Sequence, residues 1–306
     1  MRKTILVITS SIDVTVDYIE KNYFNRLTIY RVNIDQLASY QIIITDEVVT
    51  ISNQNNQMIS LDDVDGILYR KPLLPDIRNF DIAYHEMIQK DIIAVVNGIV
   101  DSFEGRVLTK PSILRKCENK IYQLIYAKKN RVLIPESFIG NSTQELSRRN
   151  DSQCIIKPIT TGKVYHKDYC EIFHTSYFNG YEKEISLTPV YVQKYVKKRY
   201  EVRLTVVDKQ FFGVKIMAAD MVDWRKSYQG NKYEKITIPI FIKKQVLMMM
   251  KEFDLHFGAF DYIVSEDEKW YFLEVNPNGQ WLWLEKELDL KISDAIVDYL
   301  LGEESE

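Results

Sequence analysis

The sequence predicts an α/β protein with more than one packed unit, and three observations support this. The chain has 306 residues, which exceeds the size of one typical hydrophobic core. Over roughly the first 105 residues, apolar strand-like runs such as TILVITSS alternate with segments of helical periodicity such as VTVDYIEKNYF. Later, three strand-like runs follow one another in PVYVQKYVKKRYEVRLTVVDKQFFGVKIMAAD, and a helix and a hairpin come next. We therefore expect a small α/β domain with a mainly parallel sheet, followed by further α/β units. The patterns also predict a hairpin in YQIIITDEVVTIS, a long helix over 80–103 with a break near Gly98 as an alternative, a helix over about 118–130, and one closing amphipathic helix in EKELDLKISDAIVDYLL.

Composition and charge exclude several classes of protein. Hydrophobic residues make up 46% and charged residues 27%, as in ordinary globular proteins, and no run approaches the ~18 apolar residues of a membrane span. The net charge of −3 argues against a general nucleic-acid binder. Three widely spaced cysteines fit neither a disulfide framework nor a metal site, so we expect a cytoplasmic protein. Together with the apolar runs and the net charge, this predicts neither a membrane nor a nucleic acid as partner.

Polar side chains interrupt an otherwise apolar hairpin near the C-terminus. Asp261 lies on its first strand, and Glu274 and Asn276 lie two positions apart on its second strand, so the last two share a face. A turn at 265–269 brings Asp261 beside that face. Two carboxylates and an amide form an oxygen set suited to Mg²⁺ with phosphates, and unpaired buried carboxylates are costly. We favour a metal site over the alternative, a strand end with a turn-forming Asn-Pro.

Two upstream strands carry charged residues that suit a nucleotide. Lys157 ends the apolar strand CIIK, where its ammonium suits phosphate oxygens; the alternative is that it reaches solvent at the strand end. Glu201 and Arg203 share a face of the strand EVR. The acid suits ribose hydroxyls and the guanidinium suits a transferring phosphate or a substrate carboxylate, with an ordinary cross-strand ion pair as the alternative.

The order IIKP, VQKYV, EVR, FDYIV, LEVNP resembles the ATP-grasp superfamily over about residue 110 to the C-terminus. The resemblance implies an N-terminal Rossmann-like domain followed by two ATP-grasp subdomains that clasp ATP. It divides the chain into an N-terminal domain at 1–105, a central lid subdomain at 106–190 and a C-terminal ATP-grasp domain at 191–306. It also implies ATP and two Mg²⁺ ions as cofactors.

The resemblance implies roles for individual residues. Asp261, Glu274 and Asn276 match its metal ligands. The matching nucleotide-binding positions are the phosphate lysines Lys120 and Lys157, the adenine-hinge residues Gln193, Lys194 and Val196, and the ribose acid Glu201. Arg203 and Arg225 are expected to steady an acyl-phosphate. Asp223 is a candidate base, although pairing with Arg225 or a loop turn is an alternative.

Within the superfamily, KPITTGKV, LYRKP, DWR and EVNPNGQWLWLE resemble the maturases of microviridin-type graspetides. This implies an ATP-dependent ligase that activates Asp or Glu side chains of a ribosomal precursor peptide, leader plus core, and joins them to Thr, Ser or Lys side chains. It also implies a homodimer. The chain departs from many relatives in having a single glycine, Gly162, in the phosphate loop, so other segments must shield the acyl-phosphate. The alternatives are a ligase for a small amino acid or a protein C-terminus, and a non-catalytic ATP-grasp protein that binds peptide or nucleotide.

Overall fold

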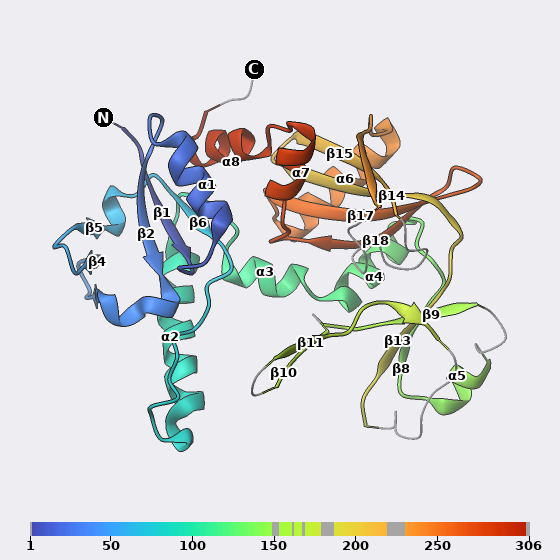
Figure 1. Cartoon of the computed structure of the whole chain (residues 1–306), viewed down its shortest axis with the longest axis horizontal. Helices are drawn as coiled ribbons and strands as arrows, with labels where there is room; N and C mark the ends of the chain where they lie inside the picture. Colours follow the sequence, from blue (N-terminus) through green and yellow to red (C-terminus); the bar gives the residue numbers. More distant parts are fainter. Residues whose placement is uncertain are drawn as a thin grey trace.

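The computed structural model describes residues 2–148, 153–160, 162–166, 169–178, 187–218 and 230–303. Three main groups of strands are seen in Figure 1, and helices α3 (Pro111–Cys117) and α4 (Lys120–Lys129) run between them. The sequence predicts a helix over about 118–130, and α4 confirms it. Helix α3, which has Pro111 in its first turn, was not predicted.

The first group is a parallel sheet with strand order β2-β1-β6-β7. Its strands are β1 (Thr4–Thr9), β2 (Thr28–Asn33), β6 (Gly66–Tyr69) and β7 (Arg106–Leu108). Ile5 and Val7 pack into a core with helix α1 (Val14–Tyr23), while Leu6 and Ile8 pack into another core with helix α2 (Ile82–Ser102). Because both faces of β1 are covered, its sequence is continuously apolar.

Two further segments complete this end of the molecule. A three-stranded antiparallel sheet consists of β3 (Tyr40–Ile44), β4 (Val49–Asn53) and β5 (Met58–Ser60), and the predicted hairpin is β3–β4. Short 3-10 helices η1 (Ile34–Ser39) and η2 (Leu61–Asp63) flank it. Helix α2 continues through Gly98, where the sequence suggests a break.

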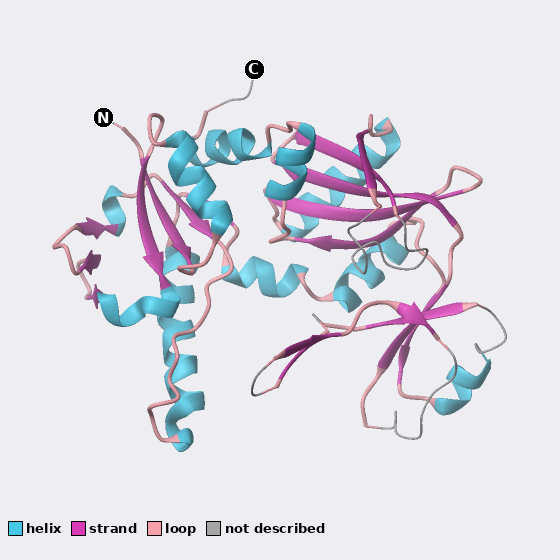
Figure 2. Ribbon diagram, in the orientation of Figure 1, coloured by secondary structure: helices cyan, strands magenta, loops and turns pink. Residues whose placement is uncertain are grey.

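The central group is an antiparallel sheet with strand order β12-β9-β13-β8. Its strands are β8 (Ser137–Gly140), β9 (Cys154–Lys157), β12 (Ser176–Tyr177) and β13 (Val190–Lys194), with helix α5 (Thr143–Arg148) beside them. A separate hairpin pairs β10 (Lys163–Tyr165) with β11 (Cys170–Ile172). This group lies apart from the N-terminal sheet, as Figure 2 shows.

The third group is a five-stranded antiparallel sheet with order β16-β15-β14-β17-β18. Its strands are β14 (Lys198–Val207), β15 (Gln210–Met217), β16 (Lys232–Lys235), β17 (Phe257–Ser265) and β18 (Trp270–Asn276). Helix α6 (Ile240–Phe253) packs Val246, Met249 and Phe253 against one face. Met248, by contrast, is exposed.

The C-terminal segment forms two helices, whereas the sequence predicts one closing helix. Asp289 adopts a left-handed conformation, with φ at 47°, and this ends α7 (Leu282–Leu288) before α8 (Ile292–Leu301) begins. Helix α8 packs against β6 of the N-terminal sheet and shares the core of Ile5 and Leu68. The last helix of the chain therefore joins the C-terminal unit to the N-terminal sheet.

We propose three domains, and the sequence predicts their limits near residues 105 and 190. Strand β7 pairs with β6, and β13 pairs with β9, so each of these strands belongs to the preceding sheet and the two limits are better placed just after them, near residues 108 and 194. No helix among the described residues is long and apolar enough to cross a membrane.

Candidate functional site

The predicted metal-binding residues meet on neighbouring strands. Asp261 on β17 lies directly opposite Glu274 on β18, and Asn276 lies opposite Ala259. The register shifts between Asp261 and Tyr262, where the strand irregularity marks a β-bulge. Val275, between the two polar residues of β18, is buried. The strand therefore presents Glu274 and Asn276 on one face and Val275 on the other, as the sequence predicts.

Each of the two carboxylates contacts a basic side chain. Lys120 Nζ lies 3.2 Å from Glu274 Oε2, and the same ammonium donates to the Pro158 carbonyl at 3.0 Å. Arg203 Nη1 contacts both oxygens of Asp261, at 2.9 Å and 2.7 Å. A Cβ at Gly279 would lie 2.8 Å from Arg203 Nη2, so the glycine permits the next loop to approach the guanidinium closely. Each acidic side chain of the predicted metal set therefore pairs with one basic side chain.

The donor set fits Mg²⁺ in its chemistry. Asp261, Glu274 and Asn276 offer carboxylate and amide oxygens, which Mg²⁺ binds together with waters and phosphates. Within the described ranges, no three His, Cys, Asp or Glu residues cluster as ligands. A metal here would therefore depend on two carboxylates, one amide and the oxygens of a bound nucleotide. Asn276 Oδ1 accepts a hydrogen bond from the Asn278 N–H at 3.0 Å.

Lys157, a predicted phosphate lysine, lies next to Gln193 and Tyr191. Its ammonium donates to Gln193 Oε1 at 3.2 Å and lies 4.3 Å from the centre of the Tyr191 ring. Gln193 Nε2 in turn donates to Ser137 Oγ at 2.9 Å and to the Tyr191 hydroxyl at 3.2 Å. Burial raises the pKa of Tyr191, so this hydroxyl stays neutral. Gln193 therefore links the Lys157 ammonium on β9 to Ser137 on β8.

A small cavity lies beside Lys120, between helix α4 and strands β13 and β18. The residues that line it are Lys120, Leu124, Ile134, Tyr191, Gln193, Phe272 and Leu273. The predicted phosphate lysine Lys120 and the predicted adenine-hinge residue Gln193 therefore border one space.

The remaining nucleotide residues have partners of their own. The Lys194 N–H donates to the Glu136 carbonyl at 2.8 Å, so this N–H belongs to the central sheet. Val196 follows the end of β13 in the connection to β14. Glu201 is 7% exposed and binds Lys198 Nζ at 2.5 Å. The roles of these residues in binding adenine and ribose stay proposals, and Asp223 and Arg225 lie outside the described residues.

The sequence analysis missed Gln123. Its carboxamide is 3% exposed and forms two hydrogen bonds with the backbone of Val275, one from Nε2 to the carbonyl and one from the N–H to Oε1, both 2.8 Å long. Nothing in the spacing of ENKIYQ identifies this contact, because Gln123 and Val275 are far apart in the sequence.

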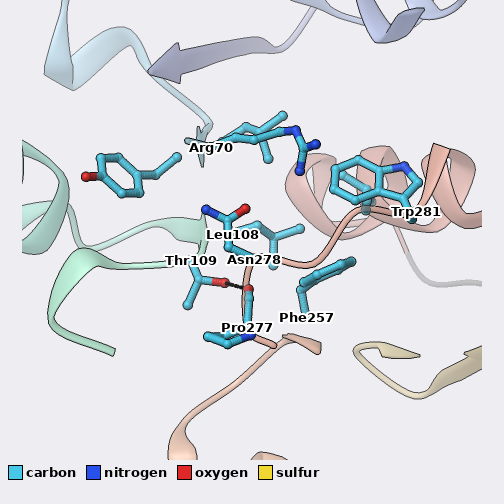
Figure 3. Close-up of a pocket in the computed structure, with 10 residues that line it drawn as sticks. Arg70, Leu108, Thr109, Phe257, Pro277, Asn278 and Trp281 are labelled. Carbon is cyan, nitrogen blue, oxygen red and sulfur yellow. Dashed lines mark hydrogen bonds between the residues drawn. The ribbon is translucent and has the colours of Figure 1, made fainter. Parts of the chain in front are cut away.

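Arg70 is another buried charge close to the site. For Arg70 and Lys71 in LYRKP, the sequence leaves open binding of an acidic substrate, binding of a leader segment, or ordinary surface charges. Arg70 is 1% exposed, so it is neither a surface charge nor accessible to a peptide. Its Nε lies 3.0 Å from Asp13 Oδ2, and its guanidinium carbon lies 4.3 Å from the Trp281 ring centre, as Figure 3 shows for the latter pair. Burial lowers the pKa of Arg70, and the Asp13 carboxylate acts in the opposite direction. Arg70 instead joins the N-terminal sheet to the loop after β18.

Lys71 is different. Its side chain is exposed, but its ammonium lies close enough to other protein atoms and to Arg203 for both to affect its pKa. Burial and the neighbouring charge of Arg70 lower its pKa to about 8, with Lys163 and Arg203 acting in the same direction. Lys71 adds positive charge on the side of the site that faces the N-terminal sheet.

An antiparallel central sheet followed by a larger antiparallel sheet that ends in a carboxylate-bearing hairpin is the arrangement of the ATP-grasp fold. Residues 175–300 match the family model of the RimK-like ATP-grasp domain, so the chain contains a domain of that kind.

Comparison with known proteins agrees with this. The tetrahydromethanopterin:alpha-L-glutamate ligase of Methanocaldococcus jannaschii is 22% identical over 237 residues, covering 74% of this chain and 78% of that protein. A RiPP-associated ATP-grasp ligase of Chryseobacterium gregarium, in complex with ADP and a leader and core peptide, superposes with a TM-score of 0.87 at 24% identity, over 99% of this chain and 98% of that one. The macrocyclase MdnC of Microcystis aeruginosa, bound to precursor peptide MdnA, gives 0.86 at 24% identity, over 97% and 99%. These similarities show the ATP-grasp fold along the whole chain.

Proposed function

We propose that the protein is an ATP-dependent ligase that forms ester or amide bonds between side chains of a ribosomal precursor peptide. The observation that carries the proposal is the pairing of Asp261 with Glu274 across the hairpin, beside Lys120 and Arg203, in an ATP-grasp fold. The similar folds of two ligases solved with precursor or leader and core peptides support a peptide as the substrate.

The reaction has two steps. A carboxylate oxygen of a peptide Asp or Glu attacks the γ-phosphorus of ATP, the bond to ADP breaks, and an acyl-phosphate forms. A Thr or Ser hydroxyl or a Lys amine of the same peptide then attacks the acyl carbon, phosphate leaves and the nucleophile loses its proton. Because both groups belong to one bound peptide, the second step gains from proximity, and exclusion of water protects the acyl-phosphate.

The residues of the chain hold the reacting groups. Lys120 and Lys157 bind phosphate oxygens, and Arg203 stabilises the transferring phosphoryl group. Up to two Mg²⁺ ions, when bound by the hairpin, supply charge neutralisation at the phosphates. In the structure Lys120 and Arg203 contact the hairpin carboxylates, so a nucleotide competes with these carboxylates for both basic side chains. We retain Arg225 as a second phosphoryl ligand and Asp223 as a candidate base.

The proposal is tested by incubating the protein with ATP, Mg²⁺ and a short peptide encoded beside its gene. The mass of the peptide is then measured by mass spectrometry. We expect the peptide to lose whole molecules of water, one for each bond closed, only when ATP is present. A peptide whose mass stays constant while ATP is consumed would contradict the proposal.

One alternative has support of its own, namely transfer of a glutamate to an acceptor. The match to the RimK-like domain and the similarity to the glutamate ligase favour it. The same experiment with glutamate added separates the two, because transfer of glutamate raises the mass of the acceptor whereas ring closure lowers the mass of the peptide.

We also propose a homodimer that uses the exposed face of α2. The N-terminal half of this helix extends away from the rest of the chain in Figure 1, and Tyr84 and Met87 on it are 56% and 54% exposed. Because these two residues are three positions apart, they form one apolar stripe on the helix, and Phe80, just before the helix begins, is 58% exposed.

If this stripe is the dimer contact, light scattering should give twice 36.1 kDa for the wild type. Replacing Met87 by Glu should yield the monomer, because a charge would be buried without a partner. The control is Lys269→Glu, a 59% exposed side chain in the hairpin turn at 265–269 rather than on α2, which should stay dimeric. A monomeric wild type would rule out the contact.

A further inference from the structure

Gln123 connects helix α4 to the strand that carries two of the predicted metal ligands. It lies three residues after Lys120, so both side chains project from the same side of the helix. Lys120 contacts Glu274, and Gln123 contacts the next residue, Val275. Successive turns of the helix therefore hold successive residues of the strand.

Among the described strands, β18 is at the edge of its sheet, so the outward backbone groups of Val275 face no described strand. The Gln123 carboxamide supplies what such a strand would offer. Its oxygen accepts from the N–H and its nitrogen donates to the carbonyl, each at 2.8 Å. A further edge group, the Phe272 N–H, donates to the Leu133 carbonyl at 2.9 Å.

Residue type matters here. A primary amide is both donor and acceptor, and Gln123 Nε2 uses a second hydrogen to reach the Cys117 carbonyl at 2.6 Å. Two carbonyls and one N–H therefore converge on one buried side chain. A glutamate in the ionised form would satisfy the N–H but set an oxygen against both carbonyls.

We propose that Gln123 is a positioning residue for metal binding. It fixes the orientation of β18 at Val275, and thereby the direction in which Glu274 and Asn276 project toward Asp261. This inference rests on the proposed function, because it assumes that the hairpin binds the metal of a nucleotide.

The test is the binding of Mn²⁺, as a spectroscopic substitute for Mg²⁺, to the full chain with ADP, measured by electron paramagnetic resonance. Gln123→Leu, which has a similar volume but no polar group, should weaken Mn²⁺ binding by about 10-fold or more, the typical effect of losing a group that orients a metal ligand. The matched control is Val246→Ala in α6, a fully buried residue of the core that also contains Val275. It should lower thermal stability without changing the Mn²⁺ affinity.

The pH dependence of Mn²⁺ binding by Gln123→Glu distinguishes a positioning role from a purely structural one. Metal sites normally lose affinity as the pH falls, because their ligands become protonated. The buried carboxyl that this substitution introduces must be protonated to donate to a carbonyl. The Mn²⁺ affinity of the Gln123→Glu variant, relative to that of wild type, should therefore improve as the pH is lowered.

The outcomes are distinct. Unchanged Mn²⁺ affinity in Gln123→Leu, with a loss of thermal stability like that of Val246→Ala, would overturn the positioning role and leave the proposed function standing. A wild-type chain that binds no Mn²⁺ with ADP would overturn the metal assignment and the positioning role together.

Discussion

Replacing Glu274 by Gln should reduce ATP-dependent water loss from the peptide by about 100-fold or more while the protein stays folded. The amide keeps the size of the side chain but removes the negative charge next to the phosphates. Metal-bound charge stabilisation contributes several kcal/mol to such reactions, and each ~1.4 kcal/mol is a factor of ten in rate. The rate is measured by mass spectrometry at saturating ATP and Mg²⁺.

The control substitution is Glu266→Gln in the turn of the same hairpin. Glu266 is 62% exposed and pairs with Lys197 at 2.9 Å. An exposed pair of this kind contributes little, so the control should retain wild-type activity. Undiminished water loss in Glu274→Gln would disprove the metal assignment.

Of the substitutions proposed here, Arg70→Met should lower the free energy of unfolding the most. The substitution leaves Asp13, which is 9% exposed, without its charged partner, and it also removes the hydrogen bond from Nη2 to Thr15 Oγ1 at 3.1 Å. Breaking a buried ion pair on one side costs about 3–5 kcal/mol. The free energy of opening is measured by hydrogen exchange at the backbone amides of β1 and β6.

Two variants identify the cause. Asp13→Asn keeps an oxygen that can accept from Thr15 N and Val16 N at the start of α1, and it removes the charge. The double variant Asp13→Asn with Arg70→Met should therefore be more stable than Arg70→Met alone. Arg78→Met, at a side chain 86% exposed, should change little. If Arg70→Met resembled Arg78→Met, the proposed connection between the N-terminal sheet and the Trp281 loop would be wrong.

Much of the fold follows from local sequence patterns. The alternating first domain, the three consecutive strands and the hairpin with its turn at 265–269 all appear in the structure. The apolar run at Ile5–Ile8 forms the strand that the sequence predicts, because a strand covered on both faces has no polar face. The break at Asp289 was missed, since a left-handed residue other than glycine has a weak sequence signal.

The site is only partly predictable for a different reason. Period-two alternation places Glu274 and Asn276 on one face, and the hairpin turn places Asp261 beside them. For Glu201 and Arg203 the sequence leaves open binding of ribose and phosphate or an ordinary cross-strand ion pair, and it does not identify the partner. In the structure Arg203 binds Asp261 across the sheet and Glu201 binds Lys198. Contacts set by strand register or by a helix against a strand edge, such as that of Gln123, depend on packing between distant segments.

The central claim is that the protein activates a peptide carboxylate as an acyl-phosphate. Its most direct test uses a peptide whose Asp and Glu side-chain carboxylates carry heavy oxygen, incubated with the protein, ATP and Mg²⁺. The account predicts that each bond formed transfers one labelled oxygen to the released phosphate, because the attacking carboxylate oxygen leaves with phosphorus. Phosphate free of label, formed while the peptide loses water, would contradict it.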